Sequence, residues 1–322
     1  MTLQRLADLA HVSVATVSKA FSGSKEISEE TQQRIFAIAR ENNCFEKYHK
    51  GIYHKRVIAV IAPELRGEYY GAIITNLEQQ IRVRGGAMTL SLNQFDAKNA
   101  YELFQYHAYY QKADGIILLD GNMDDIKNPD NIPAVIFSSA KGKEIDTVLV
   151  QMDQAVSKAV DYLKEMGHRR IAFIGETLTF RKKEIFLSAM QENGLYVNPS
   201  FVVTSEKRFE EAGYSMMETL LAAPSLPTAI IAAYDHIALG AICCIKSHGL
   251  RVPDDFSMIG MDNISVVSYL DVPLTSIRIE IESICDAMLN LLAAKMDNQY
   301  YRSRQVISVP CNLVKRQSVK KL

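Results

Sequence analysis

The chain has 322 residues, of which 48% are hydrophobic, and a formal net charge of −1. This length gives room for two or three structural units with sizeable cores. The near-neutral charge excludes a uniformly basic nucleic-acid coat, although residues 1–56 hold nine Lys or Arg against six Asp or Glu. No apolar run is long enough to span a bilayer, and no secretory signal is seen, so we expect a cytoplasmic protein without a membrane role. Five cysteines without CxxC spacing indicate reduced thiols and no zinc site.

Three short helices are predicted within residues 1–42. The first runs from about Thr2 to Ala10, and the turn at His11 favours a left-handed backbone. Ser13 is placed to cap the second helix, and Ser28 to cap a longer amphipathic third helix. The short turn between the first two helices predicts a helix-turn-helix unit, a motif that in most proteins only packs and does not bind DNA.

The exposed face of the second helix has an unusual composition, because no Asp or Glu occurs between Leu9 and Lys25. Phosphate oxygens repel carboxylates and accept hydrogen bonds from hydroxyls, while small side chains let a helix N-terminus approach base edges in the major groove. A solvated helix of small residues with one lysine is the alternative interpretation. The DNA-binding hypothesis predicts contacts by Ser13, Val14, Ala15, Thr16, Ser18, Lys19 and Ser22.

Residues 43–56 have no clean periodicity and are predicted to be a linker. From Val57 onwards nine apolar runs alternate with helical patterns; the runs are VIAVIA, AMTLSL, GIILLD, AVIFSS, TVLVQM, RIAFIG, FVVTS, TAIIAA and FSMIGM. Such alternation predicts parallel sheets buried on both faces, an α/β core. The region is too long for one comfortable sheet, so we predict two doubly wound subdomains, at about 57–150 plus 278–300 and 151–277 plus 301–322.

Several stretches together carry a family resemblance, and they occur in order along the chain. They are LADLAHVSVATVSKAFSGSKEISEETQQRI, YLKEMGHRRIAFIG, PTAIIAAYDHIALGAI, GLRVPDDFSMIGMDN and DVPLTSIRIEIESICDAMLNLL. The chain resembles, over residues 2–318, the lactose/galactose repressor (LacI/GalR) family of bacterial transcription regulators. The resemblance implies a helix-turn-helix headpiece at 1–42 and a core at 57–322, similar to a type I periplasmic binding protein, that closes on a small effector. It also implies a homodimer whose two headpieces read a near-palindromic duplex DNA operator.

The resemblance implies separate roles for the residues of the second helix. Base edges would be read by Val14, Ala15 and Lys19, and phosphates would be contacted by Ser13, Thr16, Ser18 and Ser22. Lys19 replaces the usual Arg, and it cannot bind the two acceptors of guanine in a planar fork. Ser22 replaces the usual Asn.

The linker departs from the family's pattern, in which G-Y-x-P-N-x-x-A-R-x-L folds into a hinge helix on DNA. Here the stretch reads NCFEKYHKGIY, with Glu46, Gly51 and Tyr53 at or nearest the Pro, Arg and Leu positions. Glycine is a poor helix residue. We therefore expect an atypical linker, with tighter docking on the core as the alternative to a hinge helix.

The effector cleft that the resemblance implies has also diverged. Lys182 stands where the family anchors a sugar or purine with Arg, whereas the family's Asp is kept as Asp262. A surface position for Lys182 and a turn-capping role for Asp262 are the alternatives. We predict effector contacts by Tyr69, Tyr70, Lys182, Phe209, Tyr234, Asp235 and Asp262.

The effector class is predicted from these side chains. Carboxylates beyond the ends of parallel strands accept hydrogen bonds from vicinal hydroxyls, and a lysine suits a phosphate or a single carboxylate. The prediction is a sugar or sugar phosphate, with a nucleobase as second choice because it would require the missing Arg.

The leading functional hypothesis is a DNA-binding transcriptional regulator, expected to be a repressor, controlled by a small molecule. A solute-binding protein with the same core fold and an enzyme are the alternatives. No strand-linked nucleotide-binding glycine motif occurs, and the seven histidines show no catalytic or metal-ligand spacing. We therefore expect no catalytic residue, no metal and no cofactor, and a homodimer formed through the core.

Overall fold

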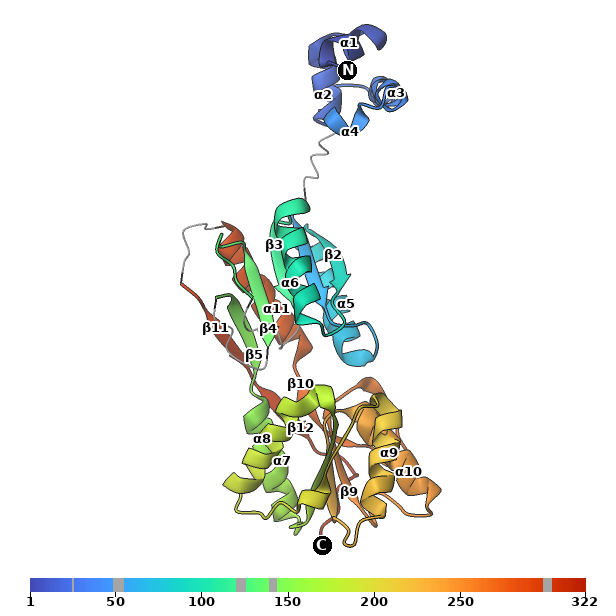
Figure 1. The fold of residues 1–322 in the computed structure, drawn as a ribbon, viewed down its shortest axis with the longest axis vertical. Helices are drawn as coiled ribbons and strands as arrows, with labels where there is room; N and C mark the ends of the chain where they lie inside the picture. The colour runs from blue at the N-terminus through green and yellow to red at the C-terminus, as the bar shows by residue number, and fades with distance from the viewer. Residues whose placement is uncertain (25, 49–54, 120–125, 139–143, 298–302) are drawn as a thin grey trace. The chain divides into compact units, whose positions relative to one another are not determined.

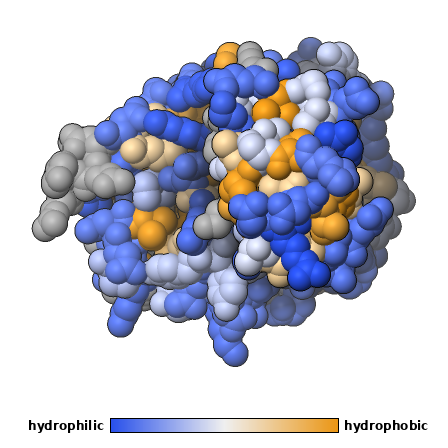
Figure 2. Space-filling view, turned by 90° about the horizontal axis from the view of Figure 1, so that it is seen from above, coloured by the Kyte–Doolittle hydropathy of each residue, from blue (hydrophilic) through white to orange (hydrophobic). Residues whose placement is uncertain are grey.

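The computed structural model describes residues 1–24, 26–48, 55–119, 126–138, 144–297 and 303–322. The chain divides into two compact units, Met1–Arg56 and Val57–Leu322, which are treated separately below. Hydrophilic residues cover most of the face seen in Figure 2, with smaller hydrophobic groups between them. The large apolar side chains lie mainly in three buried clusters, one in the first unit and two in the second.

The first unit is a small helical bundle made of α1 (Leu3–Leu9), α2 (Val14–Phe21), α3 (Glu29–Glu41) and α4 (Phe45–Tyr48). The turn between α1 and α2 has His11 at φ +53°, as the sequence predicted. Ser13 and Ser28 cap α2 and α3 by accepting hydrogen bonds from the backbone N–H groups of Thr16 and Thr31.

The bundle extends beyond the predicted headpiece boundary at residue 42, because α4 joins its core. Phe45 packs edge-on against Phe36, with ring centroids 5.2 Å apart, and the guanidinium of Arg40 lies 4.4 Å from the Phe45 ring centroid. The Tyr48 hydroxyl donates a hydrogen bond of 2.8 Å to the carbonyl of Met1. Gly51 and Tyr53, two linker positions at which the sequence departs from the family's pattern, lie outside the described residues. The side chain of Glu46, the third such position, also lies outside them.

The second unit contains two six-stranded sheets (Figure 1). The first sheet has the order β11-β5-β4-β3-β1-β2, and all its neighbouring strands are parallel. Its strands are β1 (Val57–Ala62), β2 (Ala87–Leu92), β3 (Gly115–Leu118), β4 (Ala134–Ser138), β5 (Asp146–Val150) and β11 (Val306–Val309). Helices α5 (Glu68–Val83) and α11 (Ile281–Asp297) pack on one face, and α6 (Ala97–Gln105) packs on the other.

The second sheet has the order β12-β10-β9-β8-β6-β7, parallel except for the β10–β12 pair. Its strands are β6 (Ile171–Glu176), β7 (Val202–Ser205), β8 (Ala229–Ala232), β9 (Ser257–Asp262), β10 (Thr275–Ile279) and β12 (Cys311–Val314). Its helices are α7 (Met152–Glu165), α8 (Phe180–Glu192), α9 (Phe209–Leu221) and α10 (Asp235–Ser247). Figure 1 shows α7 with α8 on one side of this sheet and α9 with α10 on the other.

The predicted doubly wound α/β core is confirmed, and each of the nine apolar runs contains a strand. The points at which the chain passes from one subdomain to the other differ from the subdomain boundaries predicted from the sequence. Strand β10 stays in the second sheet as far as Ile279, so the chain leaves that subdomain after residue 279 and not after 277. Strand β11, predicted to lie in the second subdomain, pairs with β5 in the first because its Val306 and Val309 align with Thr147 and Val150.

Candidate DNA-binding face and effector cleft

Helix α2 presents the acid-free face that the sequence predicted. Val17, Ala20 and Phe21 are buried in the bundle, so the opposite side of the helix faces outward. The predicted DNA-contact residues lie on this outward side or at the helix ends, with Ser13, Ala15, Ser18, Lys19 and Ser22 exposed and Val14 and Thr16 half-buried. The helix carries no acidic residue in its first turn, so apart from the N–H of Thr16, which the Ser13 side chain caps, no acid of the helix competes with an anion for its positive dipole end.

Three of the hydroxyls on this face, those of Ser13, Thr16 and Ser22, are already engaged in local hydrogen bonds. The Ser13 Oγ accepts from the N–H of Thr16 at 3.0 Å and is 2.8 Å from the Thr16 Oγ1. The Ser22 hydroxyl donates to the carbonyl of Lys19 at 3.1 Å. Ser13 therefore fixes the start of the helix and Ser22 its end.

Lys19 has a partner that the sequence reasoning did not single out. Its ammonium forms a hydrogen-bonded ion pair with Glu26, in the loop after α2. Both side chains are well exposed, and the hydrogen bond and charge of Lys19 lower the pKa of the Glu26 carboxyl. An acid thus lies beside the one lysine of the candidate reading helix.

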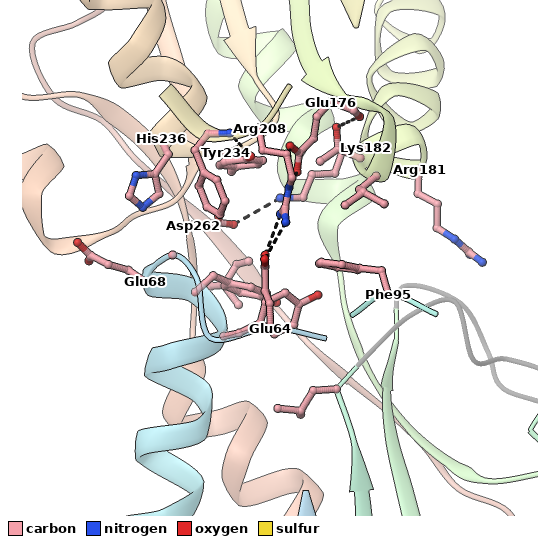
Figure 3. A pocket seen from close by; sticks show the side chains of 18 of the residues that line it. Glu64, Glu68, Phe95, Glu176, Arg181, Lys182, Arg208, Tyr234, His236 and Asp262 are labelled. Carbon is pink, nitrogen blue, oxygen red and sulfur yellow. Dashed lines mark hydrogen bonds and ion pairs between the residues drawn. The ribbon is translucent and has the colours of Figure 1, made fainter. Parts of the chain in front are cut away.

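The second unit contains a cleft between its two subdomains, with a cavity of about 220 Å³ (Figure 3). Residues that follow the carboxyl ends of strands in both sheets line it, among them Glu64 after β1, Arg208 after β7 and Tyr234 after β8. Open parallel sheets bind ligands at this edge. Of the seven predicted effector residues, six line the cavity: Tyr69, Tyr70, Lys182, Phe209, Tyr234 and Asp262.

Asp262 and Lys182 form an ion pair inside the cleft. The Lys182 Nζ is 3.4 Å from the Asp262 Oδ1 and donates a 2.8 Å hydrogen bond to the carbonyl of Ala233. The Asp262 side chain is only 9% exposed, and its backbone has φ +91°, where a side chain is rarely found. This unusual turn at the end of β9 directs the carboxylate into the cavity, as Figure 3 shows.

Aromatic rings surround this ion pair. Tyr69 and Tyr70 meet edge to face with centroids 5.1 Å apart, and Phe209 and Tyr234 do so at 5.8 Å. Burial raises the pKa of both Tyr69 and Tyr234, so their hydroxyls stay protonated near neutral pH. The Tyr234 hydroxyl also accepts a 3.0 Å hydrogen bond from the N–H of Phe209, which ties the ends of two loops together.

Asp235 has a place different from the predicted one. It is fully buried and is not among the residues that line the cavity. Its two carboxyl oxygens accept hydrogen bonds from the N–H of Ile264 at 2.8 Å and from the hydroxyl of Ser276 at 2.7 Å. Because both oxygens hold neighbouring segments, Asp235 supports the turn that carries Asp262.

The strongest polar cluster in the cleft was missed by the sequence reasoning. Arg208 donates from Nη1 and Nη2 to the two carboxylate oxygens of Glu64, at 2.7 and 2.8 Å, and from Nε to Glu176 at 3.1 and 3.3 Å. These acids lie 144 and 32 residues from Arg208 along the chain, so no local motif marks them. The only sequence signal was a charged residue beside the predicted aromatic Phe209.

Comparisons with known proteins match both units. The model of bacterial regulatory proteins, lacI family, matches residues 2–44, and the model of the periplasmic binding protein-like domain matches residues 160–319. The HTH-type transcriptional repressor CytR of Escherichia coli (strain K12) is 30% identical over 336 residues, which cover 100% of this chain and 97% of CytR. The chain belongs to the lacI family of bacterial regulatory proteins.

Other transcriptional regulators align over nearly the whole chain as well. The HTH-type transcriptional repressor PurR of Pasteurella multocida (strain Pm70) is 30% identical, over 99% of this chain and 98% of PurR. The lac repressor dimer bound to operator and the anti-inducer ONPF superposes with a TM-score of 0.75 at 21% identity, covering 99% of both chains. The transcriptional regulator CelR in complex with cellobiose gives a TM-score of 0.68 at 23% identity.

As a lacI-family protein, the chain is a DNA-binding transcriptional regulator. The family resemblance and the main functional hypothesis drawn from the sequence are confirmed, and the solute-binding alternative is disfavoured. The named relatives are repressors and not enzymes. Among the described residues, no helix is both long and apolar enough to cross a membrane, and no group of three His, Cys, Asp or Glu is arranged to hold a metal ion.

Proposed function

We propose that this lacI-family protein represses transcription by placing α2 in the major groove of a near-palindromic operator. The observation that carries the proposal is the outward face of α2, which is free of acids and rich in small and hydroxylated side chains. In this proposal bases are read by Val14, Ala15 and Lys19, and phosphates are contacted by Ser13, Thr16, Ser18 and Ser22. The protein would act at DNA in the bacterial cytoplasm.

Selection of bound duplexes from a random library tests this function. The full chain should enrich a near-palindromic site, and its binding should weaken steeply with salt because phosphate contacts release counterions. The same protein should sediment as a dimer at micromolar concentration, since two headpieces read the two halves of the site. A protein that enriches no duplex would support the solute-binding alternative.

The cleft is the proposed control site, and its effector is proposed to be a sugar or a sugar phosphate. Asp262 would accept hydrogen bonds from vicinal hydroxyls, while Tyr69, Tyr70, Phe209 and Tyr234 would pack on the apolar face of the ring. Cellobiose is the ligand named for CelR, which has the same fold. Ligand binding would change how the two subdomains close and thereby the spacing of the two headpieces.

A thermal-shift screen of sugars, sugar phosphates and purines tests the effector class. A sugar that contacts Asp262 should stabilise the wild type and lose most of its effect on Asp262→Ala. Equal stabilisation of both proteins by a ligand would show that Asp262 does not contact it. Stabilisation by purines alone would contradict the sugar proposal.

A further inference from the structure

Arg208 is held firmly within the second subdomain. Its Nε faces the carboxylate of Glu176, which is only 3% exposed, so that this acid is a permanent buried partner. The guanidinium also lies over the ring of Phe209, in the same subdomain, at 4.7 Å from its centroid. The ring of Phe95, which belongs to the first subdomain, has its centroid at 5.1 Å. These contacts set the plane of the guanidinium before any ligand arrives.

The outer edge of the guanidinium points across the cleft to the first subdomain. There Glu64, in the loop between β1 and α5, places both carboxylate oxygens against Nη1 and Nη2 (Figure 3). This two-bond geometry is the one in which Arg binds carboxylate or phosphate. Burial lowers the pKa of Arg208, but the hydrogen bonds that it donates to Glu64 and Glu176, together with the charges of these acids, outweigh burial and raise this pKa. The pair therefore joins the two subdomains through charges.

We propose that Glu64 occupies the position on Arg208 at which an anionic group of the effector binds. This group, a phosphate or a carboxylate, displaces Glu64 from Arg208 when the effector enters the cleft. This inference rests on the proposed role of the cleft as the effector site. An incoming anion keeps the Nη1 and Nη2 edge of Arg208 paired, whereas a neutral ligand that separated Arg208 from Glu64 would leave this edge and the Glu64 carboxylate without a charged partner. The cleft therefore selects an effector with an acidic end at Arg208 and hydroxyls at Asp262.

Two features of the cleft favour this assignment over the alternatives. Lys182, the anion receptor that the sequence suggested, is already paired with Asp262 and with the Ala233 carbonyl. A cationic ligand would instead have to displace Arg208 from Glu64, but Arg208 is also held by Glu176 and two aromatic rings. Glu64 lies on a loop and has one partner described, Arg208. An incoming ligand therefore displaces Glu64 and leaves Arg208 in place.

Anion binding to the full chain tests the proposal, with inorganic phosphate and acetate as separate probes measured by calorimetry and thermal shift. Glu64→Ala should bind at least one probe at least about tenfold more tightly than the wild type, because the competing carboxylate is gone. Glu68→Ala is the matched control for loss of an acid: Glu68 lines the same cavity but accepts hydrogen bonds from Ser265 and does not pair with Arg208, so its loss should raise anion affinity far less than Glu64→Ala. The probe that gains identifies the anionic group.

Arg208 variants complete the test. Glu64→Ala combined with Arg208→Gln should lose the gained anion binding, and Arg208→Lys in the same background should recover only part of it, because Lys keeps the charge without the fork. The proposal is overturned if neither probe binds Glu64→Ala more tightly, if Glu68→Ala gains equally, or if the gain survives Arg208→Gln. Duplex binding by the same variants is measured in parallel, so that a failure of the regulator function is seen separately.

Discussion

Gly213 on α9 and Gly240 on α10 let the backbones of these two helices touch. A Cβ added to Gly213 would lie 2.0 Å from the carbonyl oxygen of Ile237, and one added to Gly240 would lie 1.9 Å from that of Glu210. The two helices begin beside Phe209 and Tyr234, so their close packing positions one wall of the effector cleft. Backbone atoms cannot move aside as a flexible side-chain tip does.

Alanine at either glycine should therefore destabilise the core. We expect Gly213→Ala and Gly240→Ala each to lower the free energy of unfolding by at least roughly 1–3 kcal/mol, the usual cost of overpacking. Gly71→Ala, in the first turn of α5 with nothing within 4 Å of the added Cβ, is the control. It should raise stability by about 0.5–1 kcal/mol. Unchanged denaturation midpoints for Gly213→Ala would show that the helices do not pack as described.

The buried carboxyl of Asp235 should make stability depend on pH. Burial, reinforced by the charge of Asp262, raises its pKa from 3.8 to about 8. Between these values the unfolded chain releases a proton that the folded chain keeps. The stability due to protonated Asp235 is thus complete below the unfolded value and is lost as pH rises towards the folded value.

Asp235→Asn removes this titration while it keeps the shape of the side chain. Between about pH 5 and about pH 8 the wild type should lose at least about 1 kcal/mol of unfolding free energy relative to the variant. Urea unfolding of both proteins across this range measures the difference. A difference that stays constant with pH would mean that Asp235 is ionised throughout.

Glu26 should restrain DNA binding by the headpiece. It is negatively charged, pairs with Lys19 and lies just after the helix proposed to read DNA. Glu26→Gln should raise affinity for random duplex, roughly two- to fivefold at low salt, because it frees Lys19 and removes a like charge from the phosphates. Glu29→Gln, the same charge change in the first turn of α3, serves as the control. Equal gains of affinity in both variants would show that only the net charge of the headpiece matters, and not the pairing of Glu26 with Lys19.

The elements with long, regular patterns were predictable from the sequence. Each of the nine apolar runs contains a strand, because strands buried between helices need uninterrupted apolar residues. Strands β10, β11 and β12 were not identified individually, since polar residues interrupt their apolar sequences and each strand is partly exposed. Their pairing depends on where the chain crosses between subdomains, which no local pattern records.

The candidate cleft was predictable only in part. Aromatic residues and Asp262 follow strands and share an edge of the fold, so their meeting could be inferred. The burial of Asp235 depends on Ser276 and Ile264, and the bridge of Arg208 to Glu64 joins residues from different subdomains. Such contacts are set by tertiary packing, and no local sequence pattern marks Asp235, Glu64 or Arg208 as their members.

The most direct measurement is the affinity of the wild type and Lys19→Ala for the selected operator and for a scrambled duplex, over a range of salt concentrations. If Lys19 on α2 reads a base, its loss should cost roughly 1–3 kcal/mol on the operator and much less on the scrambled duplex. Equal losses of affinity on both duplexes, with a smaller salt dependence, would show that Lys19 contacts a phosphate and not a base. A wild type that binds both duplexes with the same affinity would contradict operator reading by α2 altogether.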